Sequence, residues 1–108
     1  MSIDMEAPFW IEILSGQTIN VNGNPMLTGE WNLLCSKRDL TLWTAKYKDG
    51  RPMKIKPHRH WRVTDVKKYF GIRGTGDILM KNFMNVFNHY EALKTDAQFH
   101  YGFAEENQ

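Results

Sequence analysis

The sequence predicts a mixed α+β fold: a small antiparallel β-barrel or sandwich of about five short strands with a C-terminal helical extension. Short apolar segments separated by Gly, Asn and Pro fill the first half, an Asp-Gly pair marks a hairpin, and apolar residues recur at helical spacing after residue 63. The 108 residues fit a single domain that is strand-rich over 8–57, helical over 63–94 and frayed over 104–108.

The first strands are predicted from residue type. Residues 9–14 combine aromatic and β-branched side chains, and a turn at Ser15-Gly16 separates them from a second short strand, Thr18–Val21. Asn22-Gly23-Asn24-Pro25 is predicted to be a loop, because Asn and Gly tolerate positive φ and Pro cannot donate to a ladder. The apolar residues 30–35 are predicted to form a third strand.

A hairpin is predicted at Asp49-Gly50, since both positions of a type I′ turn need positive φ. Its strands would be residues 40–48 and 51–56, with Lys48 paired to Arg51, and Pro57 would end the second strand. Side chains alternate across a strand, so this register gives the hairpin one apolar face and one basic, aromatic face. The basic, aromatic face consists of Trp43, Tyr47, Lys54 and Lys56.

Two helices are predicted to follow. Apolar residues recur at spacings of three and four over Val63–Phe70, Thr64-Asp65 suits the N-cap and first turn, and Gly71 would end the helix. A longer helix is predicted from about residue 76 to residue 93. Its apolar stripe is so broad that the sheet or another subunit must cover it.

The net charge of +2 conceals a strong asymmetry. Residues 37–73 hold twelve Lys and Arg against three Asp, a net +9, whereas the remainder holds two bases against nine acids, a net −7. A basic segment of this kind indicates a polyanionic partner. The alternative is a basic face balanced by an acidic face within one fold, or an interface between subunits.

The basic segment also carries aromatic residues, and nucleic-acid binding needs both cations for phosphates and flat side chains for unstacked bases. We therefore expect RNA or another single strand as the partner. The expected binding residues are Trp43, Tyr47, Lys54, Lys56, Arg59, Arg62, Arg73 and Gly74. The alternative is that Trp43 and Tyr47 pack beneath the C-terminal helix, with lysine stems over them.

The segment Gly71-Ile72-Arg73-Gly74-Thr75-Gly76-Asp77 has two interpretations. Its backbone amides could hold a phosphate beside Arg73, or its glycines could supply a helix C-cap and a tight turn. Asp77 weakens the first interpretation, because its carboxylate competes for the same helix end.

Two short segments resemble Sm/LSm-like proteins, which are SH3-type barrels that assemble into rings and bind RNA. Residues 10–16 are similar to the opening of the first Sm signature, and Ile72-Arg73-Gly74 with Ile78 is similar to the second. The resemblance implies a β-barrel with Arg73 and Gly74 in the RNA-contacting loop. Gly71-Ile72-Arg73-Gly74 also resembles the GxxG loop of KH RNA-binding domains.

Other chemistry is sparse. His58 and His60 lie two apart and could share a metal, but no third ligand is near in sequence, and Cys35 is interpreted as a small buried hydrophobe. No nucleophile motif or Walker loop occurs, so we expect a non-enzymatic protein without a cofactor. One cysteine and an acidic N-terminus predict a cytoplasmic protein, and no membrane span is predicted.

The alternative function is an assembly or adaptor protein. Its charge asymmetry and the Met- and Phe-rich helix over residues 76–93 would then form contacts with a partner or within a homo-oligomer.

Overall fold

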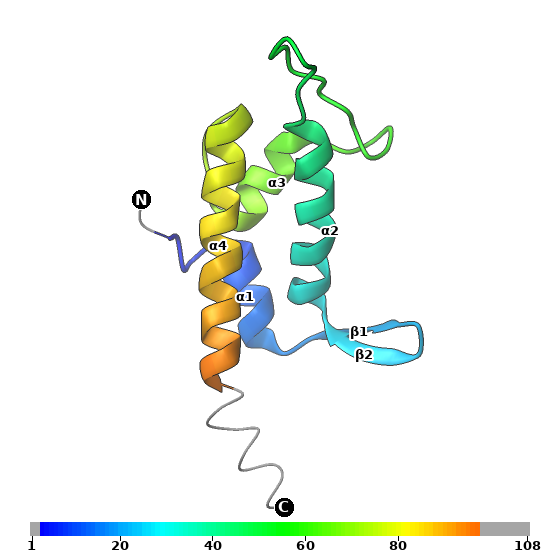
Figure 1. Ribbon diagram of the computed structural model, residues 1–108. Helices are drawn as coiled ribbons and strands as arrows, with labels where there is room; N and C mark the ends of the chain where they lie inside the picture. The colour runs from blue at the N-terminus through cyan, green and yellow to red at the C-terminus, as the bar shows by residue number, and fades with distance from the viewer. Residues whose placement is uncertain (1–2, 98–108) are drawn as a thin grey trace, which may run out of the picture.

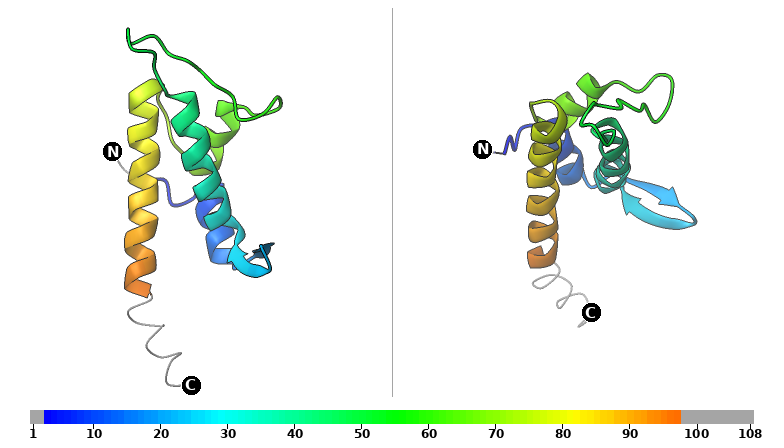
Figure 2. Two further views of the ribbon diagram at one scale, coloured as in Figure 1. Left: turned by 45° about the vertical axis from the view of Figure 1, so that its right-hand side comes forward. Right: turned by 45° about the horizontal axis from the view of Figure 1, so that its top comes forward.

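A computed structural model describes residues 3–97 and shows four helices and one two-stranded antiparallel sheet within them. In chain order the elements are α1 (Pro8–Ser15), β1 (Thr18–Val21), β2 (Asn24–Leu27), α2 (Thr28–Trp43), α3 (Val63–Phe70) and α4 (Gly76–Ala97). The helices α2 and α4 run antiparallel, with α1 and α3 behind them (Figure 1). The β-hairpin projects from one end of this helical body, and residues 44–62 form a long loop at the other, as the views in Figure 2 also show.

The predicted five-stranded barrel or sandwich is wrong, because residues 3–97 contain only two strands, in one open sheet. The Sm-like architecture is contradicted with it, since residues 10–16 lie in α1 and its C-cap. The strand Thr18–Val21 is confirmed, but it pairs with Asn24–Leu27, part of which was expected to be a loop. The turn between them has positive φ at Asn22 and Gly23, as a type I′ hairpin requires.

The helix α1 replaces the first predicted strand. Pro8 stands at its start, and Gly16 ends it with a left-handed φ of 73° while donating its N–H to the carbonyl of Ile13. Proline fits the first turn because its missing N–H has no partner there, and glycine fits the left-handed position just after a helix. The spacing from Pro8 to Gly16 indicates a helix. The prediction relied instead on the strand propensity of residues 9–14.

The helix α2 replaces the third predicted strand, residues 30–35, and the beginning of the fourth, residues 40–48. Leu33 and Leu40 are fully buried and lie two helical turns apart, so one face of α2 points into the core. Gly29 permits the close approach of α1, since a Cβ there would lie 2.7 Å from Cδ1 of Ile13.

The two predicted C-terminal helices are confirmed. α3 spans Val63–Phe70, and Gly71 ends it at φ 66° with its N–H donated to the carbonyl of Lys67. Gly71 also lies against the N-terminal segment, where an added Cβ would come within 2.9 Å of Ala7 Cβ and Asp4 Cβ. The glycine segment was interpreted either as a phosphate-binding loop or as a helix C-cap with a tight turn. Gly71 is a helix C-cap. α4 begins at Gly76, as expected, and extends past residue 93 to Ala97.

One buried cluster joins the four helices and covers much of the α4 stripe. Phe70 of α3 lies at its centre, with ring centroids 5.1 Å from Phe9 and 5.2 Å from Phe83. The fully buried side chains of the cluster are Phe9, Leu33, Leu40, Phe70, Leu79, Phe83 and Val86. The tail predicted to fray, residues 104–108, lies outside the described residues.

The polar contacts of the helical body tie distant elements together. Glu30 of α2 accepts hydrogen bonds from Tyr90 (2.8 Å) and Lys94 (2.7 Å), both on α4. Tyr69 of α3 donates its hydroxyl proton to Glu12 of α1. No helix within residues 3–97 has the length and apolarity needed to cross a membrane.

Candidate nucleic-acid interface

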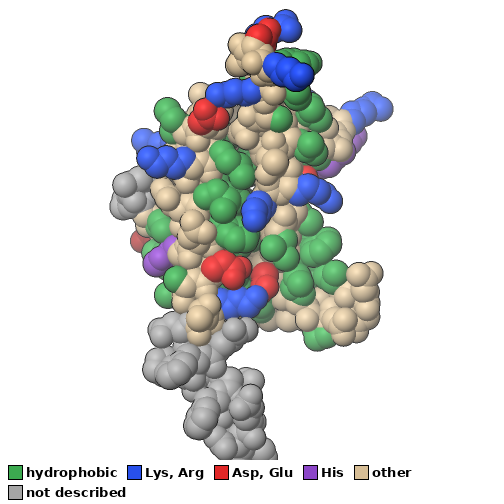
Figure 3. All heavy atoms as spheres, in the orientation of Figure 1, with side chains coloured by type: hydrophobic (Ala, Val, Ile, Leu, Met, Phe, Trp, Pro, Cys, Tyr) green, Lys and Arg blue, Asp and Glu red, His purple; other side chains and the backbone are tan. Residues whose placement is uncertain are grey.

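Residues 44–62, here called the basic loop, connect α2 to α3 at the end of the molecule opposite the β-hairpin (Figure 1). The loop contains seven Lys and Arg and one Asp, a net charge of +6 without its two histidines. Figure 3 shows Lys and Arg side chains gathered around this end on the face in view. The fold therefore concentrates much of the positive charge at one end of a helical body.

The predicted hairpin in this loop is only partly present. A turn does form around Asp49-Gly50, but it is not the predicted type I′ turn, because Gly50 has positive φ (92°) and Asp49 does not. The N–H of Gly50 donates to the carbonyl of Tyr47, so Lys48 and Asp49 are the central residues, and the N–H of Tyr47 donates to the carbonyl of Arg51, each at 2.9 Å. The only bridge in the described part of the loop joins Lys46 and Pro52, so the predicted pairing of Lys48 with Arg51 is wrong.

Two physical reasons explain the missing ladder. The helix α2 continues to Trp43 and removes the first half of the expected strand from residues 40–48. Pro52 cannot donate to a ladder, and Asp49 binds Arg51 twice, through the backbone N–H at 3.1 Å and Nε at 2.7 Å. Trp43, Tyr47, Lys54 and Lys56 therefore do not lie on one face of a β-hairpin, as predicted. Their relative positions depend instead on the irregular conformation of the loop.

The two aromatic residues of that face have different environments. Tyr47 is 50% exposed, with the Arg51 guanidinium 5.2 Å from its ring centroid. Trp43 is half-buried at the end of α2 and packs against Trp61, with centroids 5.3 Å apart. The expectation of burial thus applies to Trp43, while Tyr47 presents its ring to solvent.

The cations of the loop are mostly without carboxylate partners. Within residues 3–97, Lys46 pairs with Asp77 and Arg51 pairs with Asp49, both at 2.7 Å. The loop cations that form no ion pair in this part of the chain are Lys48, Lys54, Lys56, Arg59 and Arg62, all exposed. These five can face an external anion without breaking an internal contact.

Arg73 and Gly74 lie apart from the loop in sequence, in the connection between α3 and α4. The carbonyl of Arg73 accepts a hydrogen bond from Asn82 Nδ2 at 2.8 Å, and its side chain is exposed. Gly74 has φ 107° and lies close to Ile78, whose Cγ2 would be 2.7 Å from an added Cβ. Thr75, at the end of this connection, and Gly76, the first residue of α4, line a pocket together with residues of the basic loop.

That pocket, here called the lysine pocket, has a volume of about 240 Å³. It lies where the end of α2, the basic loop, α3 and the start of α4 meet, and its lining is mainly apolar. Its lining residues are Trp43, Thr44, Lys46, Pro52, Lys54, Val63, Lys67, Thr75, Gly76 and Leu79. Lys46 and Lys67 were not expected as site residues, because only the folded chain brings these lysines together.

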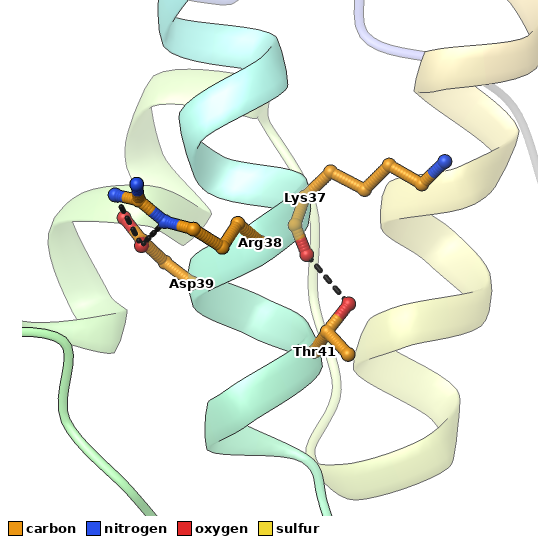
Figure 4. Close-up of polar contacts among 4 residues, drawn as sticks. All are labelled: Lys37, Arg38, Asp39 and Thr41. Atoms are coloured by element: carbon orange, nitrogen blue, oxygen red, sulfur yellow. Dashed lines mark hydrogen bonds and ion pairs between the residues drawn. The ribbon is translucent and has the colours of Figure 1, made fainter.

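The cations at the middle of α2 are exposed, but each contacts a group of the protein itself. Lys37 reaches toward α4, with Nζ 4.7 Å from the Phe87 ring centroid, and Arg38 pairs with Asp39 at 3.2 Å (Figure 4). Thr41 donates its hydroxyl to the carbonyl of Lys37 at 2.7 Å. Within the basic segment 37–73, the two cations of α2 thus have partners in the protein, whereas most cations of the basic loop form no ion pair within residues 3–97.

The remaining candidate groups show no arrangement for chemistry. His58 and His60 are exposed, and residues 3–97 contain no cluster of three His, Cys, Asp or Glu side chains that could hold a metal. Cys35 is half-buried, and burial raises the pKa of its thiol, which disfavours the reactive thiolate.

The fold and the loop together define a small helical protein with a projecting β-hairpin and a cationic loop at the opposite end. Comparisons with protein-family models, curated proteins and solved structures give no match. Functional inference therefore depends on the residues of the loop and the lysine pocket.

Proposed function

We propose that this protein is a non-enzymatic nucleic-acid-binding protein that holds RNA or another single strand at its basic loop. The observation that carries the proposal is the set of five exposed loop cations without an ion pair in residues 3–97, beside the exposed ring of Tyr47. Cations that neutralise phosphates release counterions and so favour binding, and an exposed ring offers a base a surface for stacking.

The shape of the loop favours a single strand over a duplex. Base readout in the major groove of a duplex commonly uses a helix or a two-stranded ribbon. The five cations instead lie on an irregular segment with one isolated β-bridge. Such a segment can follow the variable backbone of a single strand, with bases free to stack on side chains.

A salt titration with a labelled single-stranded oligonucleotide tests the proposal. Each phosphate contact contributes a slope of about −0.7 to log K against log salt, so five contacts give about −3.5. A binding constant that does not change with salt, or no binding at low salt, would contradict the proposal. A duplex of the same sequence should bind more weakly.

A pair of matched variants locates the binding surface. Lys56 lies in the basic loop and Lys81 lies on α4, and both are exposed and form no ion pair within the described residues. Lys56→Glu and Lys81→Glu change the net charge equally. We expect Lys56→Glu to weaken binding about tenfold and to reduce the salt slope, with Lys81→Glu near the parent protein. If the two variants lost equal affinity for the oligonucleotide, binding would depend on net charge alone and not on the basic loop.

The alternative of an assembly protein now depends on different residues from those expected. The α4 stripe is largely used in the protein's own core, whereas α1 and α2 expose apolar side chains, among them Leu14 (82%), Ile11 (60%) and Leu34 (39%). Exposed apolar groups of this kind favour contact with a second chain. Light scattering tests this alternative, and a monomer at high concentration would contradict it.

A further inference from the structure

The lysine pocket combines an apolar lining with basic side chains. Its lining includes the partly buried apolar side chains of Trp43 and Val63. Its three lysines come from two segments, Lys46 and Lys54 from the basic loop and Lys67 from α3. An apolar lining that also contains lysines fits a ligand that has a flat apolar part and an anionic part.

We propose that the lysine pocket holds one nucleotide, with the base against Trp43 and the phosphate among Lys46, Lys54 and Lys67. This inference rests on the proposed function and specifies it, because it names where one unit of a bound strand would sit. The same chemistry belongs to a free nucleoside monophosphate, and the experiment below separates the two sources.

The volume of the pocket leaves room for a single nucleotide unit. About 240 Å³ lies just below the roughly 300 Å³ at which pockets for drug-sized ligands begin. One base with its phosphate at the mouth is compatible with this size, and the other units of a bound strand would lie outside the pocket. Trp43 supplies an indole, and base stacking on aromatic rings is tolerant of sequence.

The charge of the pocket favours an anion even after its one internal ion pair is counted. Asp77 neutralises Lys46 at 2.7 Å, but Lys54 and Lys67 have no carboxylate partner within residues 3–97. Lys67 is half-buried, so part of this side chain packs against the protein. A phosphate between these two cations would form charge-assisted hydrogen bonds with both.

The backbone of Lys54 gives a second, independent observation. Its φ of 49° is in the left-handed region, which a long side chain rarely adopts. Residues held in such conformations cluster at binding sites, where the surrounding structure determines them. Here the unusual conformation occurs at a residue that lines the pocket.

Titration of the full chain with adenosine 5′-monophosphate, followed by two-dimensional NMR, tests the proposal. We expect saturable shifts of the Trp43 indole N–H and the Gly76 amide at ligand concentrations up to roughly 10 mM, because a single small group binds weakly. Adenosine alone and ribose 5-phosphate alone should each bind more weakly than the complete nucleotide. Shifts spread over all exposed lysines, without saturation, would overturn the proposal.

Two adjacent lysines of α3 provide a matched control. Lys67 lines the pocket, whereas Lys68 is exposed and does not. Lys67→Ala and Lys68→Ala remove the same charge from the same helical turn. We expect Lys67→Ala to weaken nucleotide binding about tenfold and Lys68→Ala to leave it nearly unchanged. Equal effects of the two variants would overturn the proposal.

Competition with the labelled oligonucleotide separates this inference from the proposed function. If the nucleotide displaces the strand, the pocket holds a unit of the strand. If the nucleotide binds site-specifically but no oligonucleotide binds, the pocket stands and the proposed function fails. If the oligonucleotide binds with the expected salt slope but Lys67→Ala has no effect on either ligand, the function stands and the pocket inference fails.

Discussion

The helical body and the basic loop use their side chains in opposite ways. In the body, Phe9, Phe70 and Phe83 are fully buried, and the charged Glu30 is bound by two partners on α4. In the loop, exposed cations predominate, and most have no partner within residues 3–97. Burial and pairing stabilise a fold, whereas exposed unpaired charge contributes little to stability and remains available to a ligand. Under the proposed function, the body supports the loop and the loop supplies the binding residues.

The largest effect should come from the centre of the body. Phe70 is fully buried among aromatic rings, so Phe70→Ala should lower the free energy of unfolding by about 3–5 kcal/mol. Tyr47→Ala in the loop should change it by less than about 0.5 kcal/mol. Urea denaturation measures both, and Phe70→Leu gives a milder core variant if Phe70→Ala does not fold. If Phe70→Ala and Tyr47→Ala lowered the free energy of unfolding by similar amounts, the proposed difference between body and loop would be contradicted.

A second prediction concerns the polar contact between α2 and α4. Burial alone would raise the pKa of Glu30, but hydrogen bonds from Lys94 and Tyr90 hold it below its ordinary value of 4.5. The native state therefore favours the carboxylate, and its stabilising contribution is present above pH 4.5 and lost as the pH falls through the lowered pKa. Glu30→Gln should reduce stability by about 1–3 kcal/mol at neutral pH.

The difference in free energy of unfolding between the parent protein and Glu30→Gln should become smaller at acidic pH. The reason is that protonation removes the negative charge of Glu30 in the parent protein as well. Denaturation measured across pH tests the sign of this effect. A difference that stays constant down to low pH would show that the charge of Glu30 does not stabilise the contact. No change in affinity for the oligonucleotide is expected, since Glu30 lies in the body.

The smallest effect on stability should occur in the loop, where binding changes instead. Asn tolerates left-handed backbone better than Lys, so Lys54→Asn should leave the free energy of unfolding unchanged or raise it by up to about 1 kcal/mol. The same variant should weaken oligonucleotide binding severalfold by removing a cation. Lys48→Asn removes an equal charge at a residue without positive φ, so it should weaken binding with no gain in stability. A loss of stability in Lys54→Asn would contradict the argument from its backbone.

Local signals predicted α3, α4 and β1, because each has its own boundary or pattern. Gly71 ends α3 in the left-handed conformation, and Gly76 begins α4, as the sequence indicated. Two helices were predicted as strands, at residues 9–14 and 30–35, where aromatic, branched and leucine side chains favoured a strand, and the strands predicted at 40–48 and 51–56 form only one isolated bridge. The Pro8-to-Gly16 spacing marked α1 as a helix, and the Leu33-to-Leu40 spacing marked α2. Strand propensity reflects fit to a half-buried surface, so packing against other elements decided these segments.

The sequence by itself determined the charge asymmetry, the helices after residue 63 and the turn at Asp49-Gly50, since each depends on residues near one another in the chain. Only the tertiary structure decided that Trp43 is half-buried while Tyr47 is exposed, and that Lys46, Lys54 and Lys67 line one pocket. A pocket between α2, α3, α4 and a loop depends on contacts between residues far apart in the chain. Such contacts arise from the packing of helices over a shared core, and no local pattern encodes them.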